Sequence, residues 1–174
     1  MQKITLAIKF IMFATLIYFG VSNNALAQSN DNEGYVGVAR YGYSGANEPA
    51  IYFRAPIGNE FSFEGSVATL FDYVLRANAY YHVNSEIKLG LGIVEYKSGN
   101  FKDTGARLSA GYQLVQAENW QLNVLAGREF IFGDKNFVEM QWRYQFSERF
   151  SVFYHLQHNF SRRNEGYLGV GYRF

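Results

Sequence analysis

Apolar and polar residues alternate along most of this chain with a period of two. In residues 61–83 the odd positions are almost all apolar, whereas the even positions include serine, glutamate, arginine, asparagine and histidine. Residues 106–114 and 138–146 show the same division. Strict alternation is typical of β-strands, because successive side chains point to opposite faces of a sheet. The pattern therefore predicts an all-β chain with no helical period after Gln28.

Short segments that contain a glutamate interrupt the alternation at regular intervals. They are Gly58-Asn59-Glu60, Asn84-Ser85-Glu86, Gln116-Ala117-Glu118-Asn119 and Ser147-Glu148-Arg149. The four glutamates are 26, 32 and 30 residues apart, which predicts five two-strand units and therefore ten strands. The predicted strands are 35–43, 50–57, 61–70, 73–83, 87–96, 105–115, 120–129, 137–146, 150–159 and 166–174. If the hairpin at 35–57 lies outside the sheet, the count falls to eight.

The N-terminus has the three parts of a secretory signal peptide. Residues 1–9 carry two lysines, residues 10–21 are apolar, and Ala25-Leu26-Ala27 matches the small-x-small pattern of a cleavage site. The apolar stretch is too short to cross about 30 Å of hydrocarbon. We therefore expect residues 1–27 to be removed, which leaves 28–174 as one exported domain.

Two architectures can use such strands. A secreted sandwich buries the apolar face, whereas a membrane barrel turns that face to lipid and lines its interior with the polar one. Aromatic residues crowd the ends of the alternating segments here, as in the interfacial girdles of membrane barrels. Together with the export signal, this favours a transmembrane antiparallel up-and-down β-barrel.

Composition excludes several other classes. The chain has no cysteine, which removes zinc ribbons, thiol nucleophiles, disulfides and lipoprotein acylation. A formal net charge of +1 gives no basis for nucleic-acid binding. We find no phosphate loop, metal-ligand cluster or dinucleotide fingerprint, and expect no cofactor and no metal.

The last predicted strand ends in Leu168, Val170, Tyr172 and Phe174 at alternate positions. This ending resembles the C-terminal signal of Gram-negative outer-membrane barrels, which implies recognition by the barrel-assembly machinery and a place in the cell outer membrane. The chain looks like the small OmpA/OmpX-type barrels, although ten predicted strands exceed their eight. By that resemblance the glutamate turns are periplasmic, loops 44–49, 97–104, 130–136 and 160–165 face outward from the cell, and the protein is a monomer.

The polar faces of the predicted strands place charged residues in the barrel interior. They are Arg40, Arg54, Glu64, Arg76, Lys88, Arg107, Glu129, Glu139, Arg143 and Arg173, with an excess of four positive charges. One interpretation is a set of ion pairs that fills and closes a narrow lumen. The other is a narrow passage that prefers anions.

A third hypothesis is a lipid A-modifying enzyme, since deacylases and palmitoyltransferases occur among small outer-membrane barrels. The candidate residues are His155, His158, Ser161 and Glu165. They resemble the deacylase His-x-Ser-Asn pattern only loosely, because Gln157 stands at the position of the nucleophilic serine and cannot attack an acyl group. We therefore expect a non-enzymatic protein with a structural or interaction role at the envelope.

Basic residues also gather in the predicted outward loops and strand ends. They are Lys97, Lys102, Arg128, Lys135, Arg162 and Arg163. Such residues either form a solvated rim or donate charge-assisted hydrogen bonds to lipopolysaccharide phosphates. Lipopolysaccharide is accordingly an expected partner, together with outer-membrane lipid.

Overall fold

The computed structural model describes residues 34–43, 46–69, 72–160 and 164–174. The predicted signal peptide and cleavage site, and also Ser161, Arg162 and Arg163, lie outside these described residues. The strands are β1 (Tyr35–Tyr43), β2 (Ala46–Ile57), β3 (Phe61–Ala68), β4 (Tyr73–His82), β5 (Ile87–Ser98), β6 (Phe101–Gln116), β7 (Trp120–Phe130), β8 (Asp134–Gln145), β9 (Phe150–Asn159) and β10 (Glu165–Arg173). Within this part of the chain, no helix is long and apolar enough to span a bilayer.

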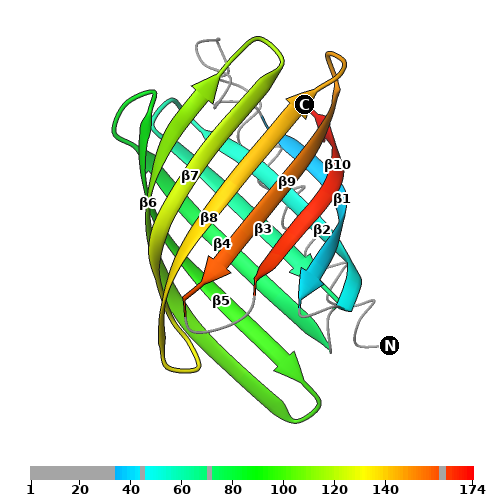
Figure 1. Cartoon of the computed structure of the whole chain (residues 1–174), viewed down its shortest axis with the longest axis vertical. Coiled ribbons are helices and arrows are strands. Elements are labelled where there is room, and N and C mark those ends of the chain that lie inside the picture. Colours follow the sequence, from blue (N-terminus) through cyan, green and yellow to red (C-terminus); the bar gives the residue numbers. More distant parts are fainter. Residues whose placement is uncertain (1–33, 44–45, 70–71, 161–163) are drawn as a thin grey trace.

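Each strand pairs antiparallel with its sequence neighbours, and β1 pairs with β10 to close a barrel (Figure 1). The prediction of ten strands is confirmed. The alternative count of eight is wrong, because β1 and β2 pair along their length with each other and with β10 and β3. Closure leaves no unpaired sheet edge, as a barrel in lipid requires.

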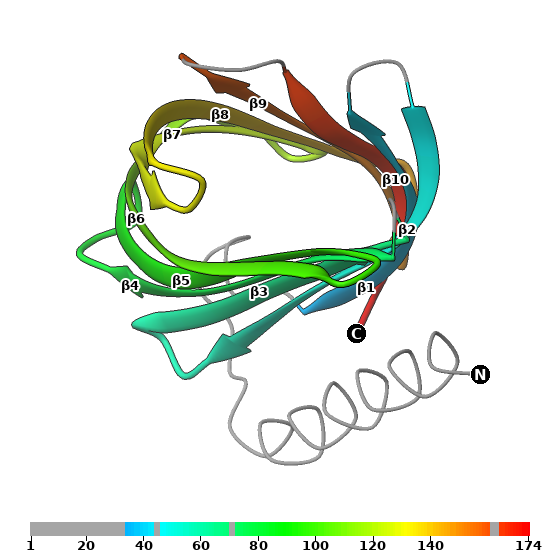
Figure 2. The same ribbon diagram turned by 90° about the horizontal axis from the view of Figure 1, so that it is seen from below.

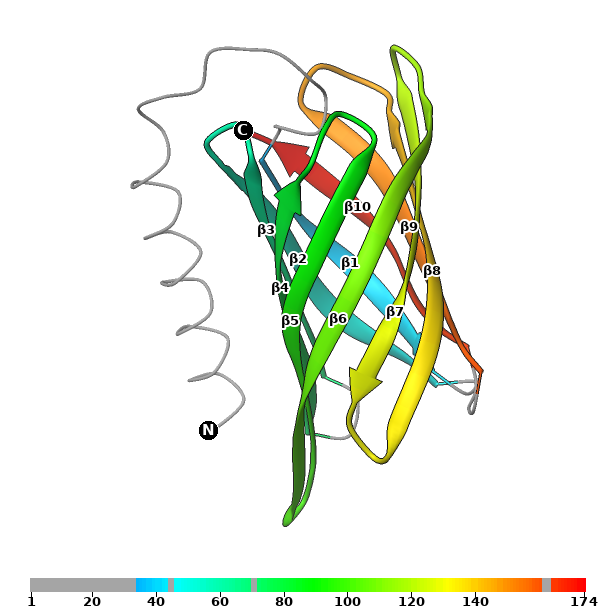
Figure 3. The ribbon, with the colours of Figure 1, turned by 90° about the vertical axis from the view of Figure 1, so that its left-hand side faces the viewer.

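The hairpins at the end of the barrel away from the C-terminus are shorter than predicted. The predicted loop 97–104 is a pair of strand ends joined by Gly99 and Asn100 alone, with Gly99 at φ +58°. Figure 3 shows β5 and β6 running beyond the neighbouring strands at this end. Backbone pairing continues there although the apolar alternation fades, so the alternation underestimates strand length. The glutamate turns all lie at the opposite end, beside the C-terminus (Figure 1).

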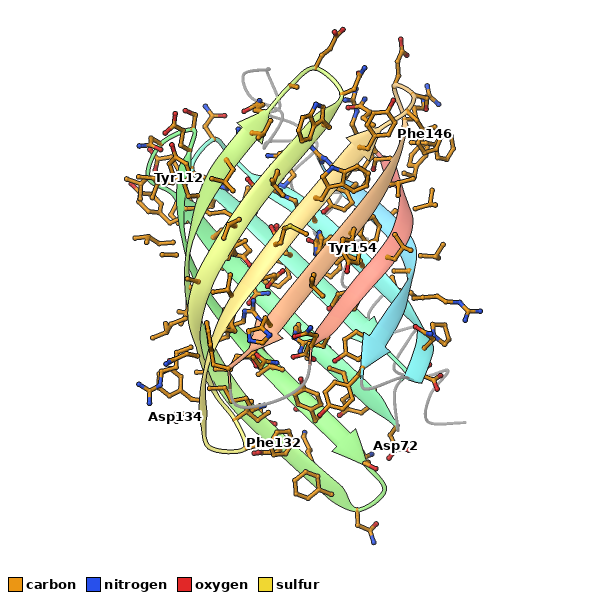
Figure 4. The ribbon with its side chains drawn as sticks, in the orientation of Figure 1. Asp72, Tyr112, Phe132, Asp134, Phe146 and Tyr154 are labelled. Carbon is orange, nitrogen blue, oxygen red and sulfur yellow. The ribbon has the colours of Figure 1, made fainter. Side chains whose placement is uncertain are left out.

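The outer surface of the barrel is apolar. Val38 is 71% exposed and Leu91 is 63% exposed, and both lie on outward positions of their strands. Outward aromatic residues gather near the glutamate turns, where Figure 4 labels Tyr112 and Phe146. Neighbouring rings are in contact across strands, with centroids 5.2 Å apart for Phe61 and Tyr81. This is the arrangement expected of a lipid-facing wall with an interfacial girdle.

The turn between β7 and β8 bends inward over the end away from the C-terminus (Figure 2). Its central residue Phe132 has a φ of +52°, while the next residue, Gly133, has +78°. A bulky side chain in the left-handed region is strained by about 1 to 2 kcal/mol. The backbone N–H of Phe132 donates to Asp103 Oδ2 at 3.1 Å, which helps to hold this conformation.

Candidate functional site

The barrel interior holds most of the charged residues of the strands. Arg54, Glu64, Arg76, Lys88, Arg107, Glu129 and Glu139 lie on inward positions and are buried. Arg143 and Arg173 also occupy inward positions and are half-buried.

Arg40 differs from the prediction because it is exposed on the outer face of β1. Tyr35 and Tyr41 fill the inner face of that strand, and both are buried. The predicted inward position of Arg40 was wrong because β1 has no clearly apolar side: tyrosines occupy one face, and valines and Arg40 occupy the other. Packing of the tyrosine rings inside the barrel determines the face.

Arg107 is the centre of the interior charge network. It is 1% exposed, and its guanidinium nitrogen Nη1 lies 2.6 Å from Glu129 Oε1, while Nη2 pairs with Glu139. The same guanidinium lies 3.9 Å from the centroid of the Phe137 ring. Two carboxylates and an aromatic face thus offset the desolvation of one buried cation.

A second cluster lies toward the end away from the C-terminus, around Arg76 and Glu165. Arg76 Nη2 is 2.7 Å from Glu165 Oε2. Arg76 also donates to the hydroxyls of Tyr167 at 2.9 Å and Tyr96 at 2.8 Å. Tyr41 donates to the same Glu165 carboxylate. Glu165 is therefore a lumen residue bound to an arginine rather than a rim residue.

A third cluster surrounds Glu64. Its Oε1 lies 3.6 Å from Arg54 Nη1 and 3.9 Å from Lys88 Nζ. Beside it, the rings of Tyr35 and Tyr52 stack with centroids 5.3 Å apart, and Tyr52 contacts Phe153 at 5.2 Å. These aromatic residues fill the interior nearer the glutamate turns.

Two glutamine side chains join the three clusters. Gln141 donates to Glu139 at 2.9 Å and accepts from Lys88 at 3.2 Å. Gln157 donates to Glu129 at 3.1 Å and to Glu165 at 3.2 Å, and accepts from Arg107 at 2.7 Å. The network is therefore continuous from Arg54 to Glu165, and cooperative hydrogen bonding of this kind rigidifies an interior.

The cavity left inside this network is small. It has a volume of about 30 Å³ and lies among Glu64, Arg76, Arg107, Glu139 and His155. A space of that size holds about one or two water molecules. Among the described residues, the buried charged groups are five cations (Arg54, Arg76, Lys88, Arg107 and Lys135) and four anions (Glu64, Glu129, Glu139 and Glu165). The buried charges therefore differ by one. The predicted excess of four also counted Arg40, which faces outward, and Arg143 and Arg173, which face inward but are only half-buried.

The candidate catalytic residues do not come together. His155 points inward, with Nδ1 3.9 Å from Glu139 Oε1, whereas His158 is exposed on the opposite face of β9. His158 Nδ1 lies 2.6 Å from Asn164 Oδ1 instead. Glu165 is engaged by Arg76, and Ser161 lies outside the described residues. The described part of the chain contains no group of three or more metal-ligating residues.

The basic rim residues occupy different environments. Lys102 pairs with Glu95 at 3.0 Å, and Arg128 pairs with Asp134, both half-exposed on the outer face. Lys97 lies over the Tyr73 ring at 5.9 Å from its centroid.

Lys135 is different, because it points into the barrel and is 4% exposed. Its predicted rim position was wrong, because β8 begins at Asp134 and its alternation turns Lys135 inward.

No protein-family model and no curated protein matches the chain. A solved KdgM porin matches with a TM-score of 0.53 and 10% identity, covering 80% of this chain and 99% of that one. This chain shares its barrel fold. The N-terminal β-barrel domain of Pseudomonas aeruginosa OprF has a TM-score of 0.44 and 15% identity, covering 82% of this chain and 98% of that one. Yersinia pestis Ail in a phospholipid bilayer nanodisc has a TM-score of 0.46 and 14% identity, covering 82% of this chain and 99% of that one.

Proposed function

We propose that this chain is an integral outer-membrane β-barrel with a closed lumen and a structural or interaction role at the cell envelope. The exposed apolar wall and aromatic girdle support insertion in a bilayer. The signal-peptide pattern supports export, and the barrel fold shared with a porin is consistent with the outer membrane. We assign the glutamate turns to the periplasm.

The continuous interior network carries the closed-lumen part of this proposal. Arg76 and Arg107, the arginines that would line an anion passage, are each held by a carboxylate at 2.7 Å or less. A passing anion would have to displace Glu165, Glu129 or Glu139, and each displacement would leave a buried charge uncompensated. The function of the barrel then depends on its outer wall and its two rims.

The outer wall and rim supply two proposed partners. Leu168, Val170 and Tyr172 project outward from β10, and exposed Phe174 follows them at the C-terminus, so the barrel-assembly machinery can reach them as the barrel closes. Lys97, Lys102 and Arg128 lie near the opposite end, where lipopolysaccharide phosphates would accept hydrogen bonds. Exposed Arg40 joins this group, because it lies on the outer face near the same end of β1.

A proteoliposome swelling assay tests the closed lumen. Vesicles that contain the folded protein should swell in small sugars and in small anions no faster than empty vesicles. Swelling that is faster in anions would support the channel alternative. A companion measurement addresses the enzyme alternative: lipid A mass spectra should be unchanged by deletion of the gene, whereas an acyl change that depends on His155 or His158 would replace the structural role.

A further inference from the structure

A pocket of about 180 Å³ lies at the end of the barrel away from the C-terminus, beyond the charge network. Its aromatic lining residues are Tyr43 of β1, Tyr96 of β5, Phe101 of β6 and Phe132 of the β7–β8 turn. Figure 4 labels Phe132 at this end. We propose that this pocket binds a small aromatic carboxylate.

The aromatic walls fit one flat ring. The Phe132 ring lies 5.6 Å from Phe101 with an interplanar angle of 16°, and 5.3 Å from Tyr96. An apolar cavity of about 150 Å³ is large enough to take up benzene. The pocket is therefore large enough for a six-membered ring that stacks on the aromatic side chains.

The backbone of Phe132 is an independent indication of a binding role. Its φ of +52° is strained for a phenylalanine, and glycine, which tolerates this conformation, occupies the next position. Strained residues persist where their surroundings hold them and are concentrated at ligand sites. Here the strained backbone carries a ring into the wall of the pocket.

Positive charge lines the same pocket. Lys135 Nζ lies 5.1 Å from the centroid of Phe132 and 5.8 Å from that of Tyr96, and its side chain is almost fully buried. Lys97 also contributes to the lining. A carboxylate attached to a bound ring would interact with the buried Lys135 ammonium in surroundings of low dielectric, where the attraction is strong.

The floor of the pocket argues against a neutral sugar. Glu165 accepts from Arg76 and from Asn159, both at 2.7 Å, and from Tyr96 at 3.2 Å. Asn159 accepts in turn from Gln157 at 2.8 Å. These floor groups are engaged with one another, so the floor offers few partners for the hydroxyls of a sugar. The floor also means that a ligand can bind here without passing through the barrel.

The test is a titration of the folded protein in zwitterionic micelles, followed by saturation-transfer NMR. Benzoate should bind saturably with a dissociation constant of about 1 mM, a value typical of so small a ligand. Benzyl alcohol, which has the ring without the charge, should bind at least tenfold more weakly, and acetate should not bind. Benzyl alcohol binding as tightly as benzoate, or no saturable benzoate binding, would overturn the proposal. Tighter binding of glucuronate would overturn it in favour of a sugar acid.

Two variants and a matched control locate the site. Lys135→Met should weaken benzoate binding at least tenfold, and Phe132→Leu should weaken it severalfold. Lys102→Met, which removes an exposed lysine outside the pocket, should leave it unchanged. Folding is checked by the shift in gel mobility between unheated and boiled samples. If Lys135→Met does not fold, the comparison of benzoate with benzyl alcohol on the unsubstituted protein decides. Unchanged binding in a folded Lys135→Met variant would contradict the assigned site.

Discussion

At the scale of single residues, the alternation identified most inward charges but not the partners that hold them. Arg107 was predicted to face the lumen, and its two carboxylates come from β7 and β8 through strand pairing. Arg40 lies within β1, whose faces are not clearly apolar and polar, so packing of the tyrosine rings fixes its face. Lys135 was misplaced because β8 begins at Asp134, three residues before the predicted start at 137.

Replacing Glu139 with glutamine should destabilise the barrel. The change removes the negative partner of Arg107 Nη2 but leaves Glu129, so we expect a loss of about 1.5 to 3 kcal/mol in the free energy of unfolding. Urea unfolding in lipid vesicles measures it. Glu118→Gln, in an exposed turn, is the matched control and should change little. Equal stability of the two variants would show that the Arg107 pairs contribute nothing.

Replacing Leu91 with arginine should test the lipid-facing wall. Leu91 is exposed and pairs with outward Leu108, so an arginine there would place a charge in hydrocarbon and cost about 2 to 4 kcal/mol. Val83→Arg, beside a glutamate turn, should cost less than about 1 kcal/mol because it lies near the interface. A similar cost at both sites, measured by unfolding in vesicles, would argue against a membrane-spanning wall.

At the scale of elements, sequence reasoning predicted the strands well and the connections less well. The four glutamate turns located the strand ends beside the C-terminus, whereas the opposite connections are shorter than predicted: loop 97–104 reduces to Gly99 and Asn100, and loop 130–136 reduces to residues 131–133. The inward bend at Phe132 carries no sequence signal except the following Gly133, because a positive φ at phenylalanine depends on its surroundings.

Two substitutions at Phe132 should separate backbone strain from ring contacts. Both Phe132→Gly and Phe132→Ala remove the stacking with Phe101. Only glycine accepts a φ of +52° without strain, so the glycine variant should be more stable than the alanine variant by about 1 kcal/mol. The comparison uses midpoints of urea unfolding. A more stable alanine variant would show that the turn relaxes to a negative φ.

Cysteine labelling should establish which end of the barrel faces outward. A cysteine at Asn100, in the β5–β6 turn, should react with a membrane-impermeant maleimide on intact cells. Cysteines at Ser85 and Glu118, at the opposite end, should react only after the outer membrane is permeabilised. The chain has no cysteine of its own, so the background is clean. The reverse pattern would invert the proposed orientation.

At the scale of the whole molecule, the pairing of β1 with β10 closes the sheet, and the interior charge network supports the proposed closed passage. Ten strands enclose a lumen narrow enough for inward side chains to fill. Tyrosine and phenylalanine rings occupy the part near the glutamate turns, and the arginine and glutamate clusters occupy the middle. The pocket at the opposite mouth therefore has a closed floor.

Electrical recording in planar bilayers tests the closed lumen most directly. Fluorescently labelled, folded protein is counted in the bilayer, so that the absence of current cannot be mistaken for failed insertion. The inserted barrels should show no steady conductance at any salt concentration, because Arg76 and Arg107 remain paired with their carboxylates. A stable, anion-selective current that is abolished when Arg76 and Arg107 are neutralised would contradict the closed lumen and make the barrel a narrow channel.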